Sequence, residues 1–460
     1  MLRVIFPQNF RPARRWIGDV LLGEFLGLDY ALAFDGAGQP RISAAGKTLV
    51  LSDAFFTGAA GTAPAGALQS WTVADSGLDA RLCAPGVPVL FGGPGFKVAA
   101  NGDAKLALDV FGSAFFMLAR FEETIHAERD EHGRFPASAS LAGRMGFLDR
   151  PIVDEYVEIL WAAMITLWPG LERKQRRART FISCDVDLPF DPACACVNRL
   201  GKRMLGQTWR EKSLASLPAT LANYRAVKRG NLARDPYWQA LSWIMDVNEK
   251  AGNEVTFNFI PEPTDRHRDN APSLHEPRMR ALLRTVHARG HLIGLHPGYN
   301  TYRHPTAFAR SVGTLRRVMD EEHIVQDAMG GRQHYLRWDV GTTAQLWAAN
   351  DLRYDSTLSY PTTPGFRTGT CHEYTMYDLA AQRPLALKQR PLVVMENAVI
   401  DQANMGLGHG ARALATMQRY QRICARFDGD FTLLWHNSSL NGPAAQALYC
   451  ELINQTGLRP

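Results

Sequence analysis

The pattern of hydrophobic positions changes near residue 179. Beyond it, short runs of β-branched, aromatic and aliphatic residues alternate with segments that repeat apolar residues at helical spacing. The runs predict strands at Thr180–Val186, Glu254–Ile260, His291–His296, Tyr335–Trp338, Tyr354–Leu358, Leu392–Ile400 and Phe431–Trp435. The segments between most of them predict helices at Tyr237–Ala251, Glu276–Arg289, Thr306–Glu322, Thr342–Asn350, Ala411–Phe427 and Ala444–Ile453. This alternation predicts an α/β domain that is either barrel-like or doubly wound.

Before residue 150 the pattern is less regular and predicts a mixed α+β domain. Short apolar runs such as Thr48–Leu51 and Val87–Phe91 are separated by turn residues. Gly92–Gly95 predicts a turn, and it lacks the Lys-Ser/Thr pair of a phosphate-binding loop. Helices are predicted over Asp109–Glu123 and from Pro151, as the first helical residue, to about Trp168.

These patterns divide the chain into three segments. Residues 1–150 form the expected N-terminal α+β domain, which could serve as a lid or a docking module. Residues 151–178 form a helix and a basic linker, and residues 179–460 form the α/β domain. A polar, helical insertion is expected within that domain at about residues 194–233.

The composition agrees with two domains and restricts the class of protein and its expected location. A chain of 460 residues is too long for one ordinary core, and 46% hydrophobic with 21% charged residues is typical of soluble globular proteins. The longest apolar run, Ile159–Trp168, falls short of the roughly 20 residues that cross a bilayer. Met1–Asp19 lacks an uninterrupted apolar segment with a cleavage site, so we expect no signal peptide and a cytoplasmic location.

Charge and cysteine usage exclude two further classes. The net charge is +6, and the one dense basic stretch, Arg173–Arg179, is expected to be a solvated linker. That stretch has no interleaved aromatic residues, so we expect no nucleic-acid partner. Seven cysteines without regular spacing suit a reducing compartment, and Cys194 and Cys196 are expected to be ordinary thiols.

The first candidate site is a pair of carboxylates where the first strand of the α/β domain ends. Asp185 and Asp187 are two residues apart, so on a strand they share one face at its carboxyl end. Two acids so placed could divide the labour, one holding a metal ion and the other moving a proton. The alternative is an Asp-rich turn without chemistry.

Further polar residues follow other predicted strands. His296 could reach a metal held by a neighbouring carboxylate, or could be an ordinary packed histidine. Arg332 could hold a carboxylate ionised, as many structural arginines do. Arg367 lies in a Pro- and Gly-rich loop that suits either a sugar or plain packing. His436 could protonate a leaving group or simply cap its strand.

The order of these motifs resembles the polysaccharide deacetylase family, the NodB-homology carbohydrate esterases. The motifs are Asp185-Val-Asp187, Gly-Leu-His296-Pro, Arg332 with Tyr335, and Leu-Leu-Trp-His436, and the resemblance covers about residues 110–460. It is closest to a divergent branch with an N-terminal extension, matched here by Phe111–Val153. The resemblance implies a deformed (β/α) barrel that holds a divalent metal, usually zinc, with cobalt, nickel or manganese as alternatives.

The resemblance also implies a role for each residue. Asp185 resembles the general base, Arg332 the residue that orients it, and His436 the general acid. The N–H of Tyr335 resembles an oxyanion donor, and Asp187 and His296 resemble metal ligands. Substrate contacts are expected from three aromatic or basic residues, Tyr299, Arg367 and Trp435.

The first motif has an extra residue between its two acids, and the third has Gln333 and His334 where the family has prolines, but one departure is serious. Where the family has its second ligand histidine, this chain has Asn300, whose amide oxygen is a poorer zinc ligand. Asn300 could still be the third ligand, or His304 or His334 could take its place, or the metal site could be impaired. The sequence therefore leaves two readings. One is a deacetylase of an N-acetylated sugar in a glycan or polysaccharide precursor, and the other is a non-catalytic carbohydrate-binding or assembly protein; neither fixes an oligomeric state.

Overall fold

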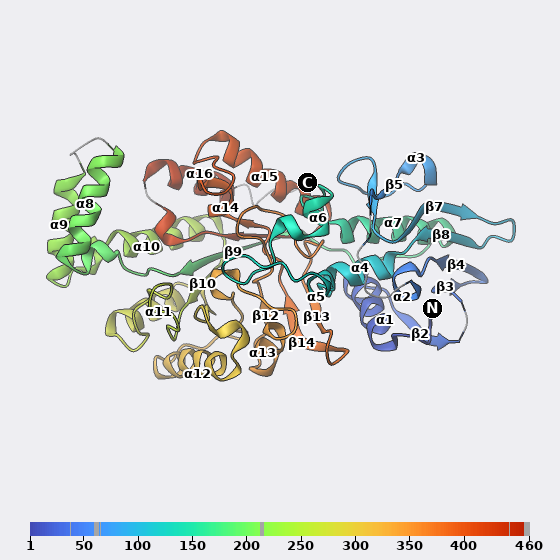
Figure 1. Cartoon of the computed structure of the whole chain (residues 1–460), viewed down its shortest axis with the longest axis horizontal. Helices are drawn as coiled ribbons and strands as arrows, with labels where there is room; N and C mark the ends of the chain where they lie inside the picture. Colours follow the sequence, from blue (N-terminus) through green and yellow to red (C-terminus); the bar gives the residue numbers. More distant parts are fainter. Residues whose placement is uncertain (37, 59–63, 65, 212–215, 441, 455–460) are drawn as a thin grey trace. The chain divides into compact units, whose positions relative to one another are not determined.

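The computed structural model describes residues 1–460 except 37, 59–63, 65, 212–215, 441 and 455–460 (Figure 1). The chain forms two compact units. The first contains Met1–Thr180, Tyr335–Val394 and Gln418–Thr432, and the second contains Phe181–His334, Met395–Met417 and Leu433–Pro460. The first crossing, after Thr180, falls close to residue 178, where the basic linker was predicted to end.

A six-stranded sheet, in the order β2-β1-β3-β4-β8-β7, forms much of the first unit. Its strands are β1 (Leu2–Pro7), β2 (Tyr30–Asp35), β3 (Arg41–Ala44), β4 (Lys47–Leu51), β7 (Gly92–Val98) and β8 (Ala104–Leu108). In β8, buried residues alternate with exposed or half-buried ones, as expected where one face of a sheet covers the core. The mixed α+β character predicted for the N-terminal part is therefore present.

Helices and two smaller sheets complete the first unit. The N-terminal helices are α1 (Arg11–Gly18), η1 (Asp19–Phe25), α2 (Ala54–Thr57), α3 (Val73–Ser76), α4 (Val110–Leu118), α5 (Glu122–Ile125), α6 (Leu141–Arg144) and α7 (Ile152–Leu167). The strands β5 (Gln69–Trp71) and β6 (Val87–Val89) pair with each other, and β12 (Tyr354–Asp355), β14 (Arg383–Gln389) and β13 (Tyr374–Asp378) form a three-stranded sheet next to α13 (Thr343–Ala349).

A five-stranded sheet in the order β11-β10-β9-β16-β15 supplies the strands of the second unit, although the first residues of β9, β15 and β16 are assigned to the first unit. These strands are β9 (Arg179–Val186), β10 (Val255–Phe259), β11 (Leu292–Leu295), β15 (Val394–Met395) and β16 (Asp430–Leu434). Strands β9, β10 and β11 are parallel, and every residue of β10 and β16 is buried, which is typical of sheets covered on both faces. The predicted α/β class is confirmed, but β11 and β15 are edge strands, so the described residues form no closed barrel.

Helices lie between or after these strands. α10 (Pro236–Ala251), α11 (Pro277–Ala288), α12 (Pro305–Glu321), α15 (Ala411–Arg426) and α16 (Pro443–Asn454) match predicted helices, whereas α14 (Glu396–Ile400) was not predicted. The insertion near residues 194–233 is helical as predicted, with α8 (Val197–Glu211) and α9 (Leu217–Lys228). Several of these helices begin with proline, whose fixed φ and missing N–H suit the first helical position.

Several predicted elements were wrong. Tyr335–Trp338 is not a strand, because Tyr335 has left-handed backbone angles (φ 61°, ψ 16°) in a short 3₁₀ turn, η6 (His334–Leu336). Leu392–Ile400 contains only the two residues of β15 and then becomes the helix α14. Gly92–Gly95 is not a turn but the start of β7, with an irregular register. Pro151 was predicted to be the first residue of its helix, but α7 begins one residue later, at Ile152.

The basic stretch after α7 is also less solvated than predicted. Arg173 pairs with Glu158 at 2.7 Å, and Arg176 donates to the ring of His372 at 2.8 Å, all within the first unit.

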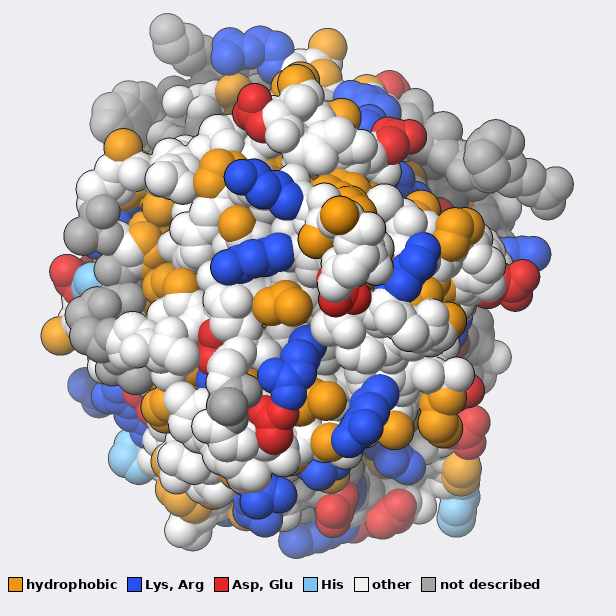
Figure 2. All heavy atoms as spheres, turned by 90° about the vertical axis from the view of Figure 1, so that its right-hand side faces the viewer, with side chains coloured by type: hydrophobic (Ala, Val, Ile, Leu, Met, Phe, Trp, Pro, Cys, Tyr) orange, Lys and Arg blue, Asp and Glu red, His pale blue; other side chains and the backbone are white. Residues whose placement is uncertain are grey.

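The surface shown in Figure 2 carries Lys and Arg side chains spread among acidic and hydrophobic ones. Among the described helices, none has the length and apolarity needed to cross a membrane.

Candidate metal centre

Three potential metal ligands converge in the second unit: Asp187, His296 and His334. Asp187 follows the last residue of β9, His296 follows β11, and His334 begins η6. The Oδ1 atom of Asp187 lies 3.1 Å from Nε2 of His296 and 3.5 Å from Nε2 of His334. Parallel strands bring such residues together because their carboxyl ends meet at one edge of the sheet.

Each histidine is held by its other ring nitrogen. Nδ1 of His296 lies 2.6 Å from the carbonyl oxygen of Arg332, and Nδ1 of His334 lies 2.7 Å from Oδ1 of Asp269. A proton on Nδ1 of each ring satisfies these two contacts and directs Nε2 towards Asp187. Metal-binding histidines usually have a carbonyl or carboxylate partner of this kind.

Asp269 is itself fixed by backbone donors from Thr264, Asp265 and Tyr299, at 2.6 to 3.2 Å. Burial raises the pKa of Asp269, but its bond with His334 and these donors lower it well below the ordinary value. The carboxylate is therefore a stable acceptor that orients His334. No sequence pattern pointed to Asp269, which lies outside every predicted strand end.

The donors fit a divalent cation. Oδ1 of Asp187 is buried and has no hydrogen-bond partner among the described residues, although both Nε2 atoms lie within 3.5 Å of it. A buried carboxylate oxygen without a partner, facing two imidazole nitrogens, is a favourable position for a cation. One carboxylate and two imidazoles form a ligand set that suits zinc and also accepts cobalt or nickel.

Asn300 lies differently from the sequence prediction of a third ligand. Its Nδ2 donates to the carbonyl of Thr264 at 3.0 Å, and its backbone N–H donates to Oγ1 of Thr264 at 2.9 Å. The second imidazole of the group comes instead from His334, which the sequence had left open as a substitute. A ligand role for Asn300 stays a prediction, and His334 is the better placed donor.

Asp185 lies deeper than Asp187 and is 2% exposed. Its Oδ1 accepts from Nη1 of Arg332 at 2.8 Å and from Nδ2 of Asn258 at 2.7 Å, and its Oδ2 is 3.8 Å from Nε2 of His296. Burial raises the pKa of Asp185, but the charge of Arg332, together with His296 and His436, lowers it below the ordinary value. One oxygen is thus anchored while the other faces the metal ligands.

His436 approaches the same carboxylates from β16. Its Nε2 lies 3.8 Å from Oδ2 of Asp187, while its Nδ1 and backbone N–H contact Oε1 of Glu396 at 2.7 and 2.8 Å. Burial lowers the pKa of His436, but the neighbouring Glu396 raises it to about 10. The sequence analysis missed Glu396, whose signal was a single acid inside the apolar run Leu392–Ile400.

Two predicted substrate residues of this unit are largely buried. Tyr299 is 6% exposed, and its ring lies under the guanidinium of Arg268 at 4.6 Å. Trp435 is fully buried and packs edge-on against Tyr449. Their substrate contacts stay predictions.

Two other predicted residues belong to the first unit. Arg367 is 2% exposed, and its guanidinium makes bonds of 2.8 and 2.9 Å with the carboxylate of Glu123. Tyr335 is partly exposed, its ring lies 4.9 Å from that of His132, and its carbonyl accepts from Arg134. The roles proposed for Arg367 and Tyr335 also stay predictions.

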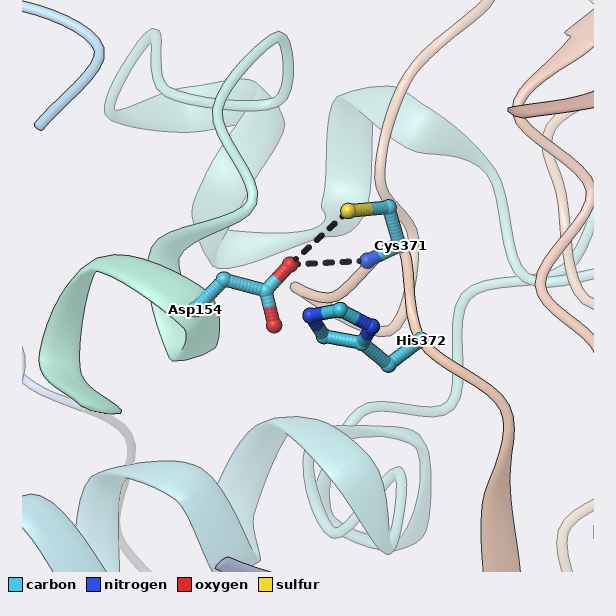
Figure 3. A group of neighbouring side chains, drawn as sticks. All are labelled: Asp154, Cys371 and His372. Atoms are coloured by element: carbon cyan, nitrogen blue, oxygen red, sulfur yellow. Dashed lines mark hydrogen bonds between the residues drawn. The ribbon is translucent and has the colours of Figure 1, made fainter. Parts of the chain in front are cut away.

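A second group of ligand-type residues, Asp154, Cys371 and His372, lies buried in the first unit (Figure 3). Oδ2 of Asp154 accepts from both the backbone N–H and the thiol of Cys371, at 2.9 and 3.1 Å. Nδ1 of His372 lies 2.8 Å from the guanidinium of Arg176. The Asp154 carboxylate and the Cys371 thiol already bond to each other, and the positively charged guanidinium of Arg176 lies against the imidazole of His372. This group therefore fits a structural hydrogen-bond network better than a metal site.

Comparisons with known proteins give limited matches. Residues 2–169, less than half of the chain, match a family of unknown function, DUF7033. No match was found among curated proteins.

Solved structures that match part of this chain include a presumed polysaccharide deacetylase from Mycobacterium smegmatis (13% identity, TM-score 0.40, covering 62% of this chain and 86% of that one). They also include the allantoinase Puue (12%, TM-score 0.36, 62% and 85%) and a presumed polysaccharide deacetylase from Pseudomonas aeruginosa PAO1 (13%, TM-score 0.36, 68% and 90%). Similarity at this level does not establish an activity, so function rests on the geometry of the site.

Proposed function

We propose that this chain is a metal-dependent hydrolase that removes the acetyl group from an N-acetylated sugar of a glycan or polysaccharide precursor. The observation that carries the proposal is the group of Asp187, His296 and His334 around one buried, unsatisfied carboxylate oxygen. Two further pairs, Asp185 with Arg332 and His436 with Glu396, lie against the same group.

The three ligands would hold a divalent cation, for which zinc is the first choice. When bound, such an ion acts as a Lewis acid that polarises a carbonyl and acidifies water. Asp185 would accept the proton of the attacking water through Oδ2, because Arg332 and Asn258 anchor its Oδ1. His436 would donate a proton to the departing amine, with Glu396 fixing the ring through Nδ1.

Two features support hydrolysis over plain binding. A binding protein has no need of an ionised carboxylate, its orienting arginine and an acid–histidine pair around one centre. The alternative, a carbohydrate-binding or assembly protein with a degenerate metal site, was favoured by Asn300. This alternative is less well supported because His334 supplies a second imidazole to the group.

The proposal is tested by metal analysis and product release together. We expect near-stoichiometric divalent metal in the wild type, and loss of that metal in Asp187→Ala and His296→Ala. Asp185→Asn should keep the metal but lose acetate release from N-acetylated oligosaccharides by about 10²–10⁴-fold, the usual contribution of a general base. A wild type that takes up no zinc, cobalt, nickel or manganese would overturn the hydrolase, and metal binding without any acetate release would favour the binding protein.

A further inference from the structure

A cavity of about 140 Å³ lies in the first unit, where the basic stretch that follows α7 packs against other segments of that unit. Four of the side chains that line it are basic: Arg81, Arg173, Lys174 and Arg176. Asp154 and His372, drawn in Figure 3, also line it. We call this feature the Arg176 cavity. Its lining belongs to the first unit, whereas the candidate metal centre belongs to the second.

Two acidic residues of the lining offset two of these positive charges. Glu158 of α7 accepts from Arg81 at 3.0 Å and from Arg173 at 2.7 Å. Asp428 accepts from the other nitrogen of the Arg81 guanidinium at 2.8 Å. These four residues therefore form an ion-pair network with equal numbers of positive and negative charges, which holds both arginines in place at the cavity.

The guanidinium of Arg176 is bound differently, because its hydrogen-bond partners are uncharged. Nη1 donates to Nδ1 of His372 at 2.8 Å, and Nη2 donates to the backbone carbonyl of Glu24. Burial lowers the pKa of His372 well below its ordinary value, so the ring is neutral and accepts through Nδ1. The Nε atom of Arg176 is buried and has no hydrogen-bond partner among the described residues. A buried, charged donor of this kind favours an anion beside it.

The lining as a whole carries an excess of positive charge. Four basic side chains against Glu158 and Asp428 leave two positive charges, those of Lys174 and Arg176, without a carboxylate partner among the described residues. The third lining acid is Asp154, and burial raises its pKa to about 7. It is therefore only partly ionised near neutral pH and does not offset the excess.

The size and charge of the cavity favour a phosphate group over other anions. A phosphate monoester carries close to two negative charges near neutral pH, whereas a single carboxylate carries one. Its oxygens accept from guanidinium N–H groups in a geometry that arginine matches well, and the Nε–H of Arg176 is available as such a donor. The cavity has room for several water-sized atoms, which is enough for a phosphate group.

We propose that the Arg176 cavity binds the phosphate group of a small ligand, either the free ion or a phosphate monoester such as a sugar phosphate. The inference does not depend on the proposed function, because the deacetylation would take place at residues of the second unit. It also gives the basic stretch after α7 a role other than that of a linker.

The test measures binding of inorganic phosphate, glucose 6-phosphate and acetate to the full chain by calorimetry, at one ionic strength set with sodium chloride. We expect a dissociation constant below about 1 mM for at least one phosphate-bearing ligand and no measurable binding of acetate. Arg176→Gln should weaken phosphate binding at least about tenfold, and Arg176→Lys should weaken it less. Arg177→Gln is the matched control, because Arg177 is exposed, follows Arg176 directly and does not line the cavity.

Two further variants secure the assignment. Asp187→Ala removes a proposed metal ligand of the second unit and should leave phosphate binding unchanged, which separates the cavity from phosphate bound to a metal ion. Lys174→Gln changes an exposed side chain of the lining, so it tests the cavity even if Arg176→Gln does not fold. We expect it to weaken phosphate binding by about threefold.

Each outcome bears on the proposal. Phosphate binding that Arg176→Gln or Lys174→Gln weakens, and that Arg177→Gln and Asp187→Ala leave unchanged, supports the cavity. Tighter binding of glucose 6-phosphate would then identify a phosphate ester as the ligand, and tighter binding of inorganic phosphate the free ion. Binding that is absent in the wild type, equally tight for acetate, or unchanged in folded Arg176→Gln overturns the proposal. Loss of binding in Asp187→Ala also overturns it, because the phosphate would then bind at the metal centre.

Discussion

Asp185 and Asp187 are two residues apart, and their surroundings give them different tasks. Asp185 is 2% exposed and has one oxygen anchored by Arg332 and Asn258. Asp187 is more exposed, and among the described residues its Oδ1 has no hydrogen-bond partner although it faces two imidazoles. A base needs an orienting partner and a free oxygen, whereas a metal ligand needs an unsatisfied oxygen, so these contacts support the proposed roles of the two acids.

The identity of the third metal ligand is the first prediction at this scale. His334→Ala should weaken zinc binding by at least about tenfold, since it removes an imidazole directed at Asp187. Asn300→Ala is the comparison and should change zinc affinity little, because its amide contacts Thr264. Competition with a chelator of known affinity measures both. A larger loss in Asn300→Ala than in His334→Ala would return the ligand role to Asn300.

Glu396 is predicted to position His436. Glu396→Gln keeps the shape of the side chain but removes the charge that contacts Nδ1 at 2.7 Å. We expect kcat for acetate release to fall about 10- to 100-fold, with metal content and KM nearly unchanged. A variant that loses metal or unfolds would show instead that Glu396 acts on the structure of the centre. Glu451→Gln, the same change at an exposed residue of α16 in the second unit, is the matched control.

How far the site could be predicted depended on where each residue lies in the chain. Asp185, Asp187, His296 and His436 are near strand ends, where a sequence pattern can find them. Asp269 and Glu396 contact His334 and His436 from a loop and a short helix, 65 and 40 residues away. No local pattern encodes such contacts, because they depend on how the strands pair.

At the scale of elements, the parallel strands β9, β10 and β11 set the distances within the site. The register pairs Asn258 of β10 with both Asp185 and Gly294, so the base and its donor lie on adjacent strands. Gly294 has no side chain where a Cβ would lie 2.0 Å from Oδ1 of Asn258. Close packing here is therefore a condition for orienting Asp185.

Gly294→Ala tests this arrangement. The added methyl group must displace Asn258, so we expect about 1–3 kcal/mol loss of unfolding free energy and a fall in kcat. Gly313→Ala in α12 is the control, because its Cβ meets nothing within 4 Å and alanine favours helices, so stability should hold or rise by up to about 1 kcal/mol. Urea unfolding and acetate release measure both. Equal effects of the two substitutions would contradict the proposed close contact.

Elements were predicted well where the pattern was long and periodic, and poorly where it was short. The helices of the second unit and strands β9, β10 and β16 follow from apolar runs and proline starts. Tyr335–Trp338 has strand-like composition, but the left-handed backbone of Tyr335 and Leu336 excludes a strand. Tertiary contacts set the backbone angles at such turns, and the composition of the segment alone does not reveal them.

At the scale of the whole molecule, segments far apart in sequence build each unit, and the alternation of strands and helices does not reveal this. Residues 335–394 and 418–432 belong to the first unit, although their pattern continued the α/β series. Within that unit, Asp154 on α7 receives hydrogen bonds from Thr370 and Cys371. Because the carboxyl group of Asp154 is buried in this contact, its protonation makes the stability of the unit depend on pH.

Burial raises the pKa of Asp154 to about 7, from an ordinary value near 4. The folded chain thus keeps a proton between about pH 4 and pH 7 that the unfolded chain releases. Stability from this group is present at low pH and is lost as pH rises towards 7, on the order of 2–3 kcal/mol between pH 5 and pH 8. Asp154→Asn imitates the protonated acid, because its amide can donate to Thr370 and accept from Cys371.

We therefore expect urea unfolding of wild type to show lower stability at pH 8 than at pH 5 from this group, and Asp154→Asn to remove that part of the slope. Asp75→Asn, at an exposed residue of the same unit, controls for the loss of one carboxylate and should leave the slope unchanged. The direction in which stability changes with pH distinguishes two cases. If Arg176 stabilised Asp154 as an ion pair, the protein would instead lose stability on acidification. A steeper decline at low pH in the wild type would therefore show that Asp154 is ionised in the folded protein.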